Sequence, residues 1–191
     1  EICACLVGSE MCIRDRSTLI NLIPRYYDVT KGSVKVDGVD VRDMTQKELR
    51  DKLGYVPQKG VLFSGTIDSN IRYGKPEITD AQVKEAAEVA QATEFIDTKP
   101  EKYESPVSQG GTNVSGGQKQ RLSIARAIAK DPEIFIFDDS FSALDFKTDS
   151  QLRKALKEYT KDATTVIVAQ RISTIPVSYT HLRAHETCAD L

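Results

Sequence analysis

The sequence predicts an α/β fold in which helices cover a mostly parallel sheet. From about residue 30 to residue 174, short apolar segments alternate with segments whose apolar residues recur at helical spacing. In addition, Ile134–Phe137 is a continuous apolar run, which is typical of a parallel strand buried on both faces. These two observations favour a single α/β domain.

The first half of this domain is expected to contain two strands and two helices. Strands are predicted at residues 33–36, before the turn Asp37-Gly38, and at residues 54–56, where Pro57 ends the strand. Thr45 and Glu48 form a capping box before a helix that carries Leu49 and Leu53. Thr79 and Gln82 cap a second helix, whose buried stripe is Val83, Ala86, Ala87 and Ala90.

The second half begins with a glycine-rich loop at residues 109–117, which leads into a helix at about residues 118–130. Asp131-Pro132 ends that helix, and the apolar strand at residues 134–137 follows. The spacing of Leu152, Ala155, Leu156 and Tyr159 predicts one more helix, and residues 165–169 one more buried strand.

Composition excludes several classes of protein. The 191 residues are 40% hydrophobic and 28% charged with a net charge of −2, which gives no reason to expect binding along a nucleic-acid backbone. The apolar runs are far shorter than the roughly 18 residues of a membrane-spanning helix. The four Cys and two His lie only near the ends of the chain, which disfavours a disulfide framework or a zinc cluster.

Two short polar segments lie next to predicted strands or helices, at positions where proteins commonly bind ligands. Asp138 and Asp139 come directly after the apolar strand, at the end where α/β sheets bind ligands, and carboxylates there can hold Mg²⁺. The segment 115–118, Ser-Gly-Gly-Gln, stands at a helix start, where free N–H groups bind anions. Each group alone would also suit an ordinary polar turn.

Together, the segment 113–121, the strand ending at Asp138 and the segment 142–145 resemble the ATP-binding-cassette (ABC) family of transport ATPases. The resemblance covers about residues 17–175 and implies a P-loop NTPase (RecA-like) core, with a helical signature subdomain at about Pro76–Lys130, truncated at both ends. It implies that ATP and Mg²⁺ are the cofactors. The residues to which it assigns roles are Ser115, Gly116, Gly117 and Gln118 (signature), Asp138 (magnesium aspartate), Asp145 (D-loop), Gln58 (contact to Mg²⁺ and the attacking water), and Ser17 and Thr18 (phosphate loop, with Ser17 on Mg²⁺).

The segment 61–71 is similar specifically to exporters, in which this region docks on the coupling helices of a membrane domain. The resemblance therefore implies three further properties: a transmembrane domain fused upstream, a second ATPase domain as partner, and a location at the cytoplasmic face of the cell membrane. A solvated loop with a few core apolar residues would also account for this segment.

Two positions depart from the family pattern. Asp139 stands where the family has the catalytic Glu, and Gln170 stands where it has the switch His. An aspartate is one methylene shorter, and a displacement of about 1 Å can cost on the order of 10²-fold in rate. Both departures, together with the segment 108–111, resemble the degenerate half of heterodimeric exporters, whose own site hydrolyses ATP slowly while its signature completes the partner's site.

The phosphate loop required by the family is missing. Ser17-Thr18 is in place, but Arg16 stands at the Lys position, and Asp15 and Glu10 stand at glycine positions. Acidic side chains in a phosphate cradle repel the ligand, and Asp15 lacks the conformational freedom of glycine. We therefore expect the chain as written to be inactive.

The genetic code offers an explanation. Residues 6–15 can be encoded as CTC GTG GGC TCG GAG ATG TGT ATA AGA GAC, and the reverse complement of this string translates as residues 177–186. The string resembles a transposase-type sequencing adapter. We infer that residues 6–16 and 177–191 are translated adapter, which leaves 1–176 as the ATPase domain with its loop replaced. The alternative is a genuine N-terminal strand and a genuine C-terminal tail.

The sequence thus predicts the ATP-binding and ATP-hydrolysing domain of an ABC exporter. One alternative is a soluble ABC ATPase that acts in repair or translation. The other is a nucleotide-binding partner that does not hydrolyse ATP and only completes the other subunit's site.

The adapter hypothesis predicts the result of resequencing the source locus with an unrelated library chemistry. A glycine-rich loop should appear in place of residues 8–16, and the segment 177–191 should be replaced by other sequence. Recovery of the same codons at both ends would show that the loop is genuine.

Overall fold

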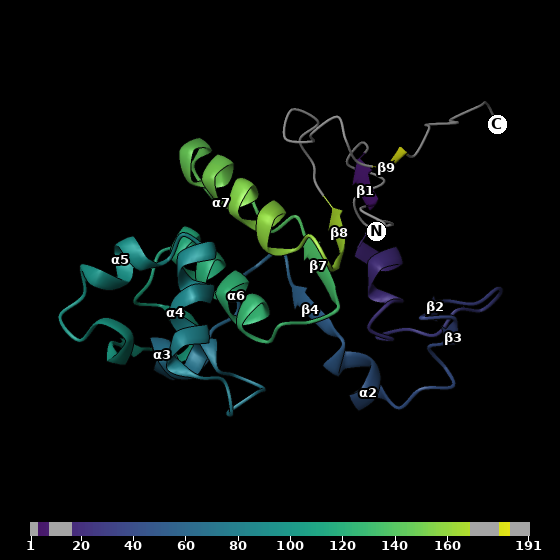
Figure 1. Cartoon of the computed structure of the whole chain (residues 1–191), viewed down its shortest axis with the longest axis horizontal. Helices are drawn as coiled ribbons and strands as arrows, with labels where there is room; N and C mark the ends of the chain where they lie inside the picture. Colours follow the sequence, from purple (N-terminus) through teal and green to yellow (C-terminus); the bar gives the residue numbers. More distant parts are fainter. Residues whose placement is uncertain (1–3, 8–16, 169–179, 184–191) are drawn as a thin grey trace.

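The centre of the fold is a parallel five-stranded sheet (Figure 1). The computed structural model of the chain describes residues 4–7, 17–168 and 180–183, with side chains for 17–168. The strands lie in the order β4-β7-β8-β1-β9, and each neighbouring pair is parallel. Their bounds are β1 Ala4–Val7, β4 Leu53–Val56, β7 Ile134–Asp138, β8 Thr164–Val168 and β9 Thr180–Arg183.

Strand β7 is buried on both faces, as its apolar run predicts. Phe135 and Phe137 point into the larger hydrophobic cluster, whereas Ile136 between them belongs to a smaller cluster with Ile20 and Leu49. Side chains alternate across a strand, so the two clusters lie on opposite faces of the sheet. The predicted α/β layering is confirmed.

Helices cover both faces. The larger cluster is formed with α3 to α7, and the smaller one with α2 and the short helix at residues 17–21, which lie apart from them in Figure 1. The bounds are α2 Gln46–Asp51, α3 Ile67–Ile71, α4 Asp80–Val89, α5 Thr93–Asp97, α6 Gly116–Ala129 and α7 Phe146–Tyr159, with 3-10 turns η1 Lys102–Glu104 and η2 Gln109–Gly111.

The two predicted capping boxes are present, at Thr45–Glu48 before α2 and Thr79–Gln82 before α4. The prediction that Leu53 belongs to the first helix was wrong. α2 ends at Asp51, and Leu53 begins β4, where it pairs with Ile134 across the ladder.

The observed boundaries of the other predicted helices and strands differ from the predicted ones by small amounts. α6 begins at Gly116 rather than Gln118, because Ser115 is already its N-cap. The last predicted strand is β8, but only Val168 in it is buried, since Val166 and Ile167 pack at the margins of the two clusters. The Asp131-Pro132 stop is confirmed, with Asp131 in the left-handed region at φ 52°.

Two small antiparallel ladders complete the described fold. β2 (Lys35–Val36) pairs with β3 (Val39–Asp40) around the turn Asp37-Gly38, where both residues have positive φ, as a type I′ hairpin requires. β5 (Gly65–Thr66) pairs with β6 (Pro106–Val107) beside α3.

Within the described ranges, no helix is long and apolar enough to cross a membrane. The expected subdomain at residues 76–130 contains α4, α5 and α6, but its boundaries stay a prediction. β9 lies within the segment 177–191, and its pairing with β1 does not test the adapter hypothesis.

Candidate functional site

Four of the predicted site residues lie together at the carboxyl ends of β4 and β7, with Ser17 contributed by the start of the helix at residues 17–21. The strands are parallel, so the segments that follow them emerge at the same edge of the sheet. Ser17 Oγ donates a hydrogen bond to Asp138 Oδ1 at 3.1 Å, and Gln58 Nε2 donates one to Asp139 Oδ2 at 3.2 Å. The site therefore contains two adjacent pairs of side chains, each joined by one hydrogen bond.

Asp138 is a buried carboxylate that suits a hard cation. Its pKa is raised, first by burial and then by the neighbouring Asp139 charge, against the hydrogen bond from Ser17. A bound cation would stabilise the ionised form and offset the cost of burial. No group of three His, Cys, Asp or Glu gathers within the described part of the chain, but Mg²⁺ commonly uses one or two carboxylates plus phosphate oxygens. Asp138 supplies a carboxylate, and Ser17 and Gln58 add a hydroxyl and an amide oxygen that can also bind Mg²⁺.

Tyr55 also contacts Asp138, which the sequence did not predict. Its hydroxyl lies 3.2 Å from Asn21 Oδ1 and 3.5 Å from Asp138 Oδ2. Burial and the charge of Asp138 raise the pKa of Tyr55, so the phenol stays protonated and can donate. The sequence did contain one indication of this contact: Tyr55 carries a hydroxyl and lies in β4, the strand that pairs with β7.

The backbone of Asp139 is bonded to the end of β8 and to Ser142. It lies in the left-handed region at φ 46°, which aspartate tolerates better than most residues. Its N–H donates to Val168 O at 2.9 Å, and its carbonyl accepts from Ser142 N at 3.3 Å and from Ser142 Oγ at 2.9 Å. The direction of the Asp139 side chain toward Gln58 is therefore fixed by the backbone.

A second residue that the sequence analysis missed, Gln120 of α6, holds the segment around Gln58. Gln120 is buried; its Oε1 accepts from Gly60 N at 2.9 Å and its Nε2 donates to Pro57 O at 3.1 Å. A Cβ on Gly60 would lie 2.8 Å from Lys119 O, so only glycine allows this close approach to α6. A polar residue on the apolar face of α6 was the signal for this contact.

The signature residues form a separate surface at the start of α6. Ser115 Oγ accepts from Gln118 N at 3.2 Å, and Gln118 Oε1 accepts from Ser115 N at 3.0 Å, which is a complete capping box. A Cβ on Gly116 would meet no atom within 4 Å, so nothing in the described chain requires glycine there. A Cβ on Gly117 would lie 3.3 Å from Ala143 O, which places the D-loop beside the signature.

The other predicted site residues are placed as follows. Asp145 is the N-cap of α7, where it accepts from Thr148 N at 3.0 Å, and this hydrogen bond lowers its pKa. Thr18 is exposed on the helix at residues 17–21. Gln170 and the loop at residues 8–16 lie outside the described residues, so their roles stay predictions.

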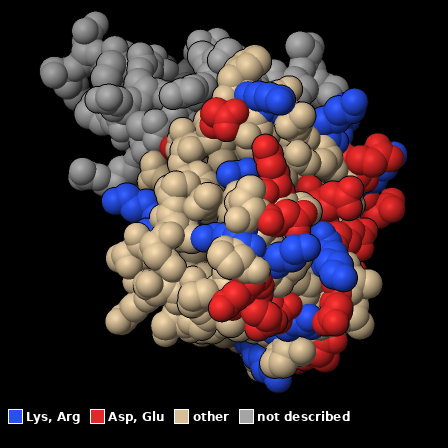
Figure 2. Space-filling model, turned by 90° about the vertical axis from the view of Figure 1, so that its left-hand side faces the viewer, with Lys and Arg blue, Asp and Glu red and all other residues tan. Residues whose placement is uncertain are grey.

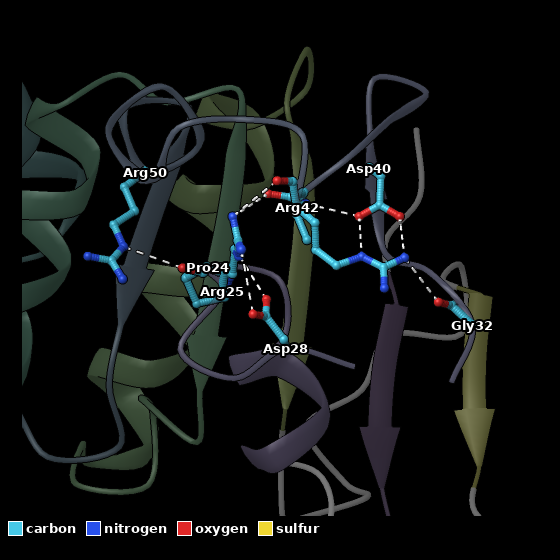
Figure 3. A network of polar contacts seen from close by, with 8 residues as sticks. Pro24, Arg25, Asp28, Gly32, Asp40, Arg42 and Arg50 are labelled. Atoms are coloured by element: carbon cyan, nitrogen blue, oxygen red, sulfur yellow. Dashed lines mark hydrogen bonds and ion pairs between the residues drawn. The ribbon is translucent and has the colours of Figure 1, made fainter. Parts of the chain in front are cut away.

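The segment that follows the helix at residues 17–21 is held by a polar network (Figure 3). The Arg25 guanidinium contacts Asp28 and the carbonyls of Val41 and Arg42, while Arg50 donates to Pro24 O at 3.3 Å. Arg50 also lies 5.3 Å from the centroid of the Tyr26 ring, and that ring meets Tyr55 edge-on at 5.8 Å. Arg50 thereby links this segment to Tyr55 through the Tyr26 ring.

Comparison with known proteins agrees with this arrangement. The sequence profile of a family described as "ABC transporter" matches residues 16–142. A Staphylococcus aureus protein, named as a multidrug export ATP-binding/permease protein, is 49% identical over 160 residues. The match covers 84% of this chain and 28% of the relative, and a second S. aureus strain gives the same values.

A solved structure has the same fold. The structure of a bacterial Atm1-family ABC exporter with ATP bound matches with a TM-score of 0.89 and 38% sequence identity. The alignment covers 95% of this chain and 32% of that chain. The present chain therefore spans less than a third of the proteins it matches.

The two bonds of Gln120 predict a local loss of stability when its side chain is removed. Gln120→Ala leaves the Gly60 N–H and the Pro57 carbonyl without this partner, so we expect a loss of about 1–3 kcal/mol in urea unfolding. Hydrogen exchange at residues 58–60 should also become faster. Gln118→Ala, at a partly exposed position of the same helix, is the control and should cost less than about 1 kcal/mol. Equal losses, without faster exchange at 58–60, would contradict the assigned role of Gln120.

Proposed function

Since the chain belongs to the ABC transporter family, we propose that it is the ATPase domain of an exporter and uses ATP and Mg²⁺ to power transport. The observation that supports this best is the pairing of Ser17 with Asp138, and of Gln58 with Asp139, at the carboxyl edge of the sheet. These oxygen atoms suit Mg²⁺ and a water molecule beside a phosphate.

In this proposal the residues have distinct roles. Ser17, Asp138 and Gln58 hold Mg²⁺, Asp139 and Gln170 act on the attacking water and the terminal phosphate, and Thr18 contributes to the phosphate site. Ser115–Gln118 and Asp145 act on the nucleotide of a second ATPase domain. Within the described chain, no hydrogen bond joins the signature to Ser17 or Asp138, as expected if the signature serves another subunit.

We further propose that the chain is the degenerate half of a heterodimer. Asp139 is hydrogen-bonded to Gln58 and is one methylene shorter than the usual Glu, so its carboxylate is poorly placed as a general base. The transmembrane domain would be fused upstream, and the ATPase domain would lie at the cytoplasmic face of the membrane. The names of the S. aureus relatives, which combine ATP binding with a permease, support this arrangement.

Two alternative functions remain to be distinguished from this proposal. A soluble ABC ATPase would lack a membrane partner, and the exposed aromatic residues of the segment 61–73 argue against it. A partner that does not hydrolyse ATP would keep the signature in use without catalysis at its own site.

Nucleotide binding is predicted to depend on the loop at residues 8–16. Calorimetry should detect no ATP affinity for the chain as written, because Glu10 and Asp15 repel phosphate. The triple variant Glu10→Gly, Asp15→Gly and Arg16→Lys should bind ATP in the presence of Mg²⁺. Adding Asp138→Asn to that variant should weaken the Mg²⁺ dependence. Micromolar ATP binding by the unaltered chain would show that the loop argument is wrong.

The degenerate-half proposal predicts an asymmetric result when the loop-restored chain is mixed with a competent ATPase domain. Ser115→Arg should abolish turnover because it blocks the partner's site, while Asp139→Asn should leave turnover nearly unchanged. Ala81→Arg, at an exposed position on α4, is the control for an added charge and should have no effect. A large loss with Asp139→Asn would show instead that this chain hydrolyses ATP itself.

A further inference from the structure

Four polar side chains form a closed ring at the carboxyl edge of the sheet. Ser17 and Asn21 lie one turn apart on the helix at residues 17–21, so they project from one face of that helix. Ser17 Oγ donates to Asp138 Oδ1 at 3.1 Å, and Asn21 Oδ1 lies 3.2 Å from the Tyr55 hydroxyl. That hydroxyl in turn lies 3.5 Å from Asp138 Oδ2. Each oxygen of the Asp138 carboxylate therefore has its own hydroxyl neighbour.

The register of the sheet brings Tyr55 to the carboxylate. Tyr55 of β4 pairs with Ile136 of β7, and side chains two residues apart along a strand lie on the same face. Asp138 is two residues beyond Ile136, so it is the diagonal neighbour of Tyr55. A ring that ends in a hydroxyl can span the distance to such a neighbour.

The ring of Tyr55 is held in place by packing. It meets the Tyr26 ring edge-on, with centroids 5.8 Å apart and planes at 88°, and the Arg50 guanidinium lies 5.3 Å from the Tyr26 centroid. Tyr55 also packs against the smaller hydrophobic cluster. Because the ring is already ordered by these contacts, holding its hydroxyl beside Asp138 costs little further side-chain entropy.

The hydroxyl of Tyr55 has one proton but two neighbouring acceptors. Asp138 Oδ2 accepts a stronger hydrogen bond than an amide oxygen does, because the carboxylate is charged. Rotation of the Asn21 amide by 180° exchanges Oδ1 and Nδ2, so that Nδ2 donates to the phenol oxygen and the phenol proton is free for Asp138. The favoured arrangement is a relay in which Asn21 donates to Tyr55 and Tyr55 donates to Asp138.

The relay affects which divalent ion suits the carboxylate. Ca²⁺ takes roughly six to eight oxygen ligands and often binds both oxygens of one carboxylate, whereas Mg²⁺ requires a near-octahedral shell and keeps several waters. With Oδ2 engaged by Tyr55, Asp138 offers a cation only Oδ1, the oxygen that faces Ser17. A single carboxylate oxygen is sufficient for Mg²⁺, but Ca²⁺ loses a ligand.

We propose that Tyr55, held by Asn21, is a positioning residue that engages Asp138 Oδ2 and thereby makes the site disfavour Ca²⁺ relative to Mg²⁺. The role of Asp138 as a cation ligand rests on the proposed function, whereas the relay follows from the four side chains. Tyr55 does not touch the cation and acts only through the orientation of the carboxylate.

A purely structural role for Tyr55 would have a different result. If its hydroxyl only stabilised the packing of β4 against the helix at residues 17–21, its loss would weaken the binding of every divalent ion by the same factor. Tyr159 of α7 is a matched control, because its hydroxyl donates to Ile128 O at 3.4 Å and it packs against the larger cluster, on the opposite face of the sheet.

The relay is tested first, in the chain as written. The side-chain NH₂ signals of Asn21, assigned with Asn21→Leu, are followed by ¹⁵N NMR. Tyr55→Phe should shift these signals and speed the exchange of one hydrogen with water, because it removes the acceptor of the Asn21 amide. Tyr159→Phe should leave them unchanged. Unchanged Asn21 signals in Tyr55→Phe would overturn the relay and the proposal with it.

The metal preference is tested in the same chain with Mn²⁺, a paramagnetic probe that broadens the signals of residues close to it. Exposed Asp and Glu side chains also attract this ion, and Figure 2 shows them interspersed with Lys and Arg on the side of α5. Only the broadening that Asp138→Asn removes is therefore counted. Mg²⁺ and Ca²⁺ are then titrated separately, and the concentration of each ion that reverses half of this broadening is measured.

Tyr55→Phe should lower the ratio of the Ca²⁺ concentration to the Mg²⁺ concentration by about fivefold, the effect of one hydrogen bond. Asn21→Leu should lower the ratio less, because the phenol keeps its proton, and Tyr159→Phe should leave it unchanged. A ratio that Tyr55→Phe does not change, or the absence of any Mn²⁺ broadening that depends on Asp138, would overturn the proposal.

ATP calorimetry of the loop-restored chain tests the ATPase proposal separately. ATP binding, together with a Ca²⁺ to Mg²⁺ ratio that Tyr55→Phe leaves unchanged, would reject only the role of Tyr55. A changed ratio without ATP binding would reject only the ATPase function.

Discussion

The burial of β7 on both faces is the constraint on which the rest of the structure depends. Phe135 and Phe137 fill one hydrophobic cluster and Ile136 the other, so the strand cannot shift in register without exposing one set of side chains. The same strand delivers Asp138 and Asp139 to the edge of the sheet. The position of the proposed magnesium site is thus set by the packing of the core.

Helix α6 connects the surfaces to which function is assigned. Its first residues carry the signature, its buried Gln120 is bonded to the segment around Gln58, and its last turn carries Arg126 beside the rings of Phe63 and Tyr73. One helix therefore positions all three groups of residues.

The main electrostatic feature of the site is the Asp138 carboxylate, whose hydrogen bonds only partly offset the cost of its burial. Asp138 accepts hydrogen bonds from Ser17 and Tyr55, yet its pKa is still raised by burial and by Asp139. Such a group favours a cation strongly. Arg126 is the opposite case, a cation whose pKa is lowered to about 10 by burial.

The sequence by itself determined the fold class and the starts of α2 and α4, and it predicted the residues of the candidate site. Capping boxes and periodicity are local signals, so Thr45, Thr79 and Ser115 could be recognised without any tertiary information. Only the tertiary structure decided that Gln58 meets Asp139, that Tyr55 and Gln120 support the site, and that Arg126 lies over the stacked rings of Phe63 and Tyr73. These contacts join residues tens of positions apart, and the packing of helices on the sheet, which no local pattern encodes, brings them together.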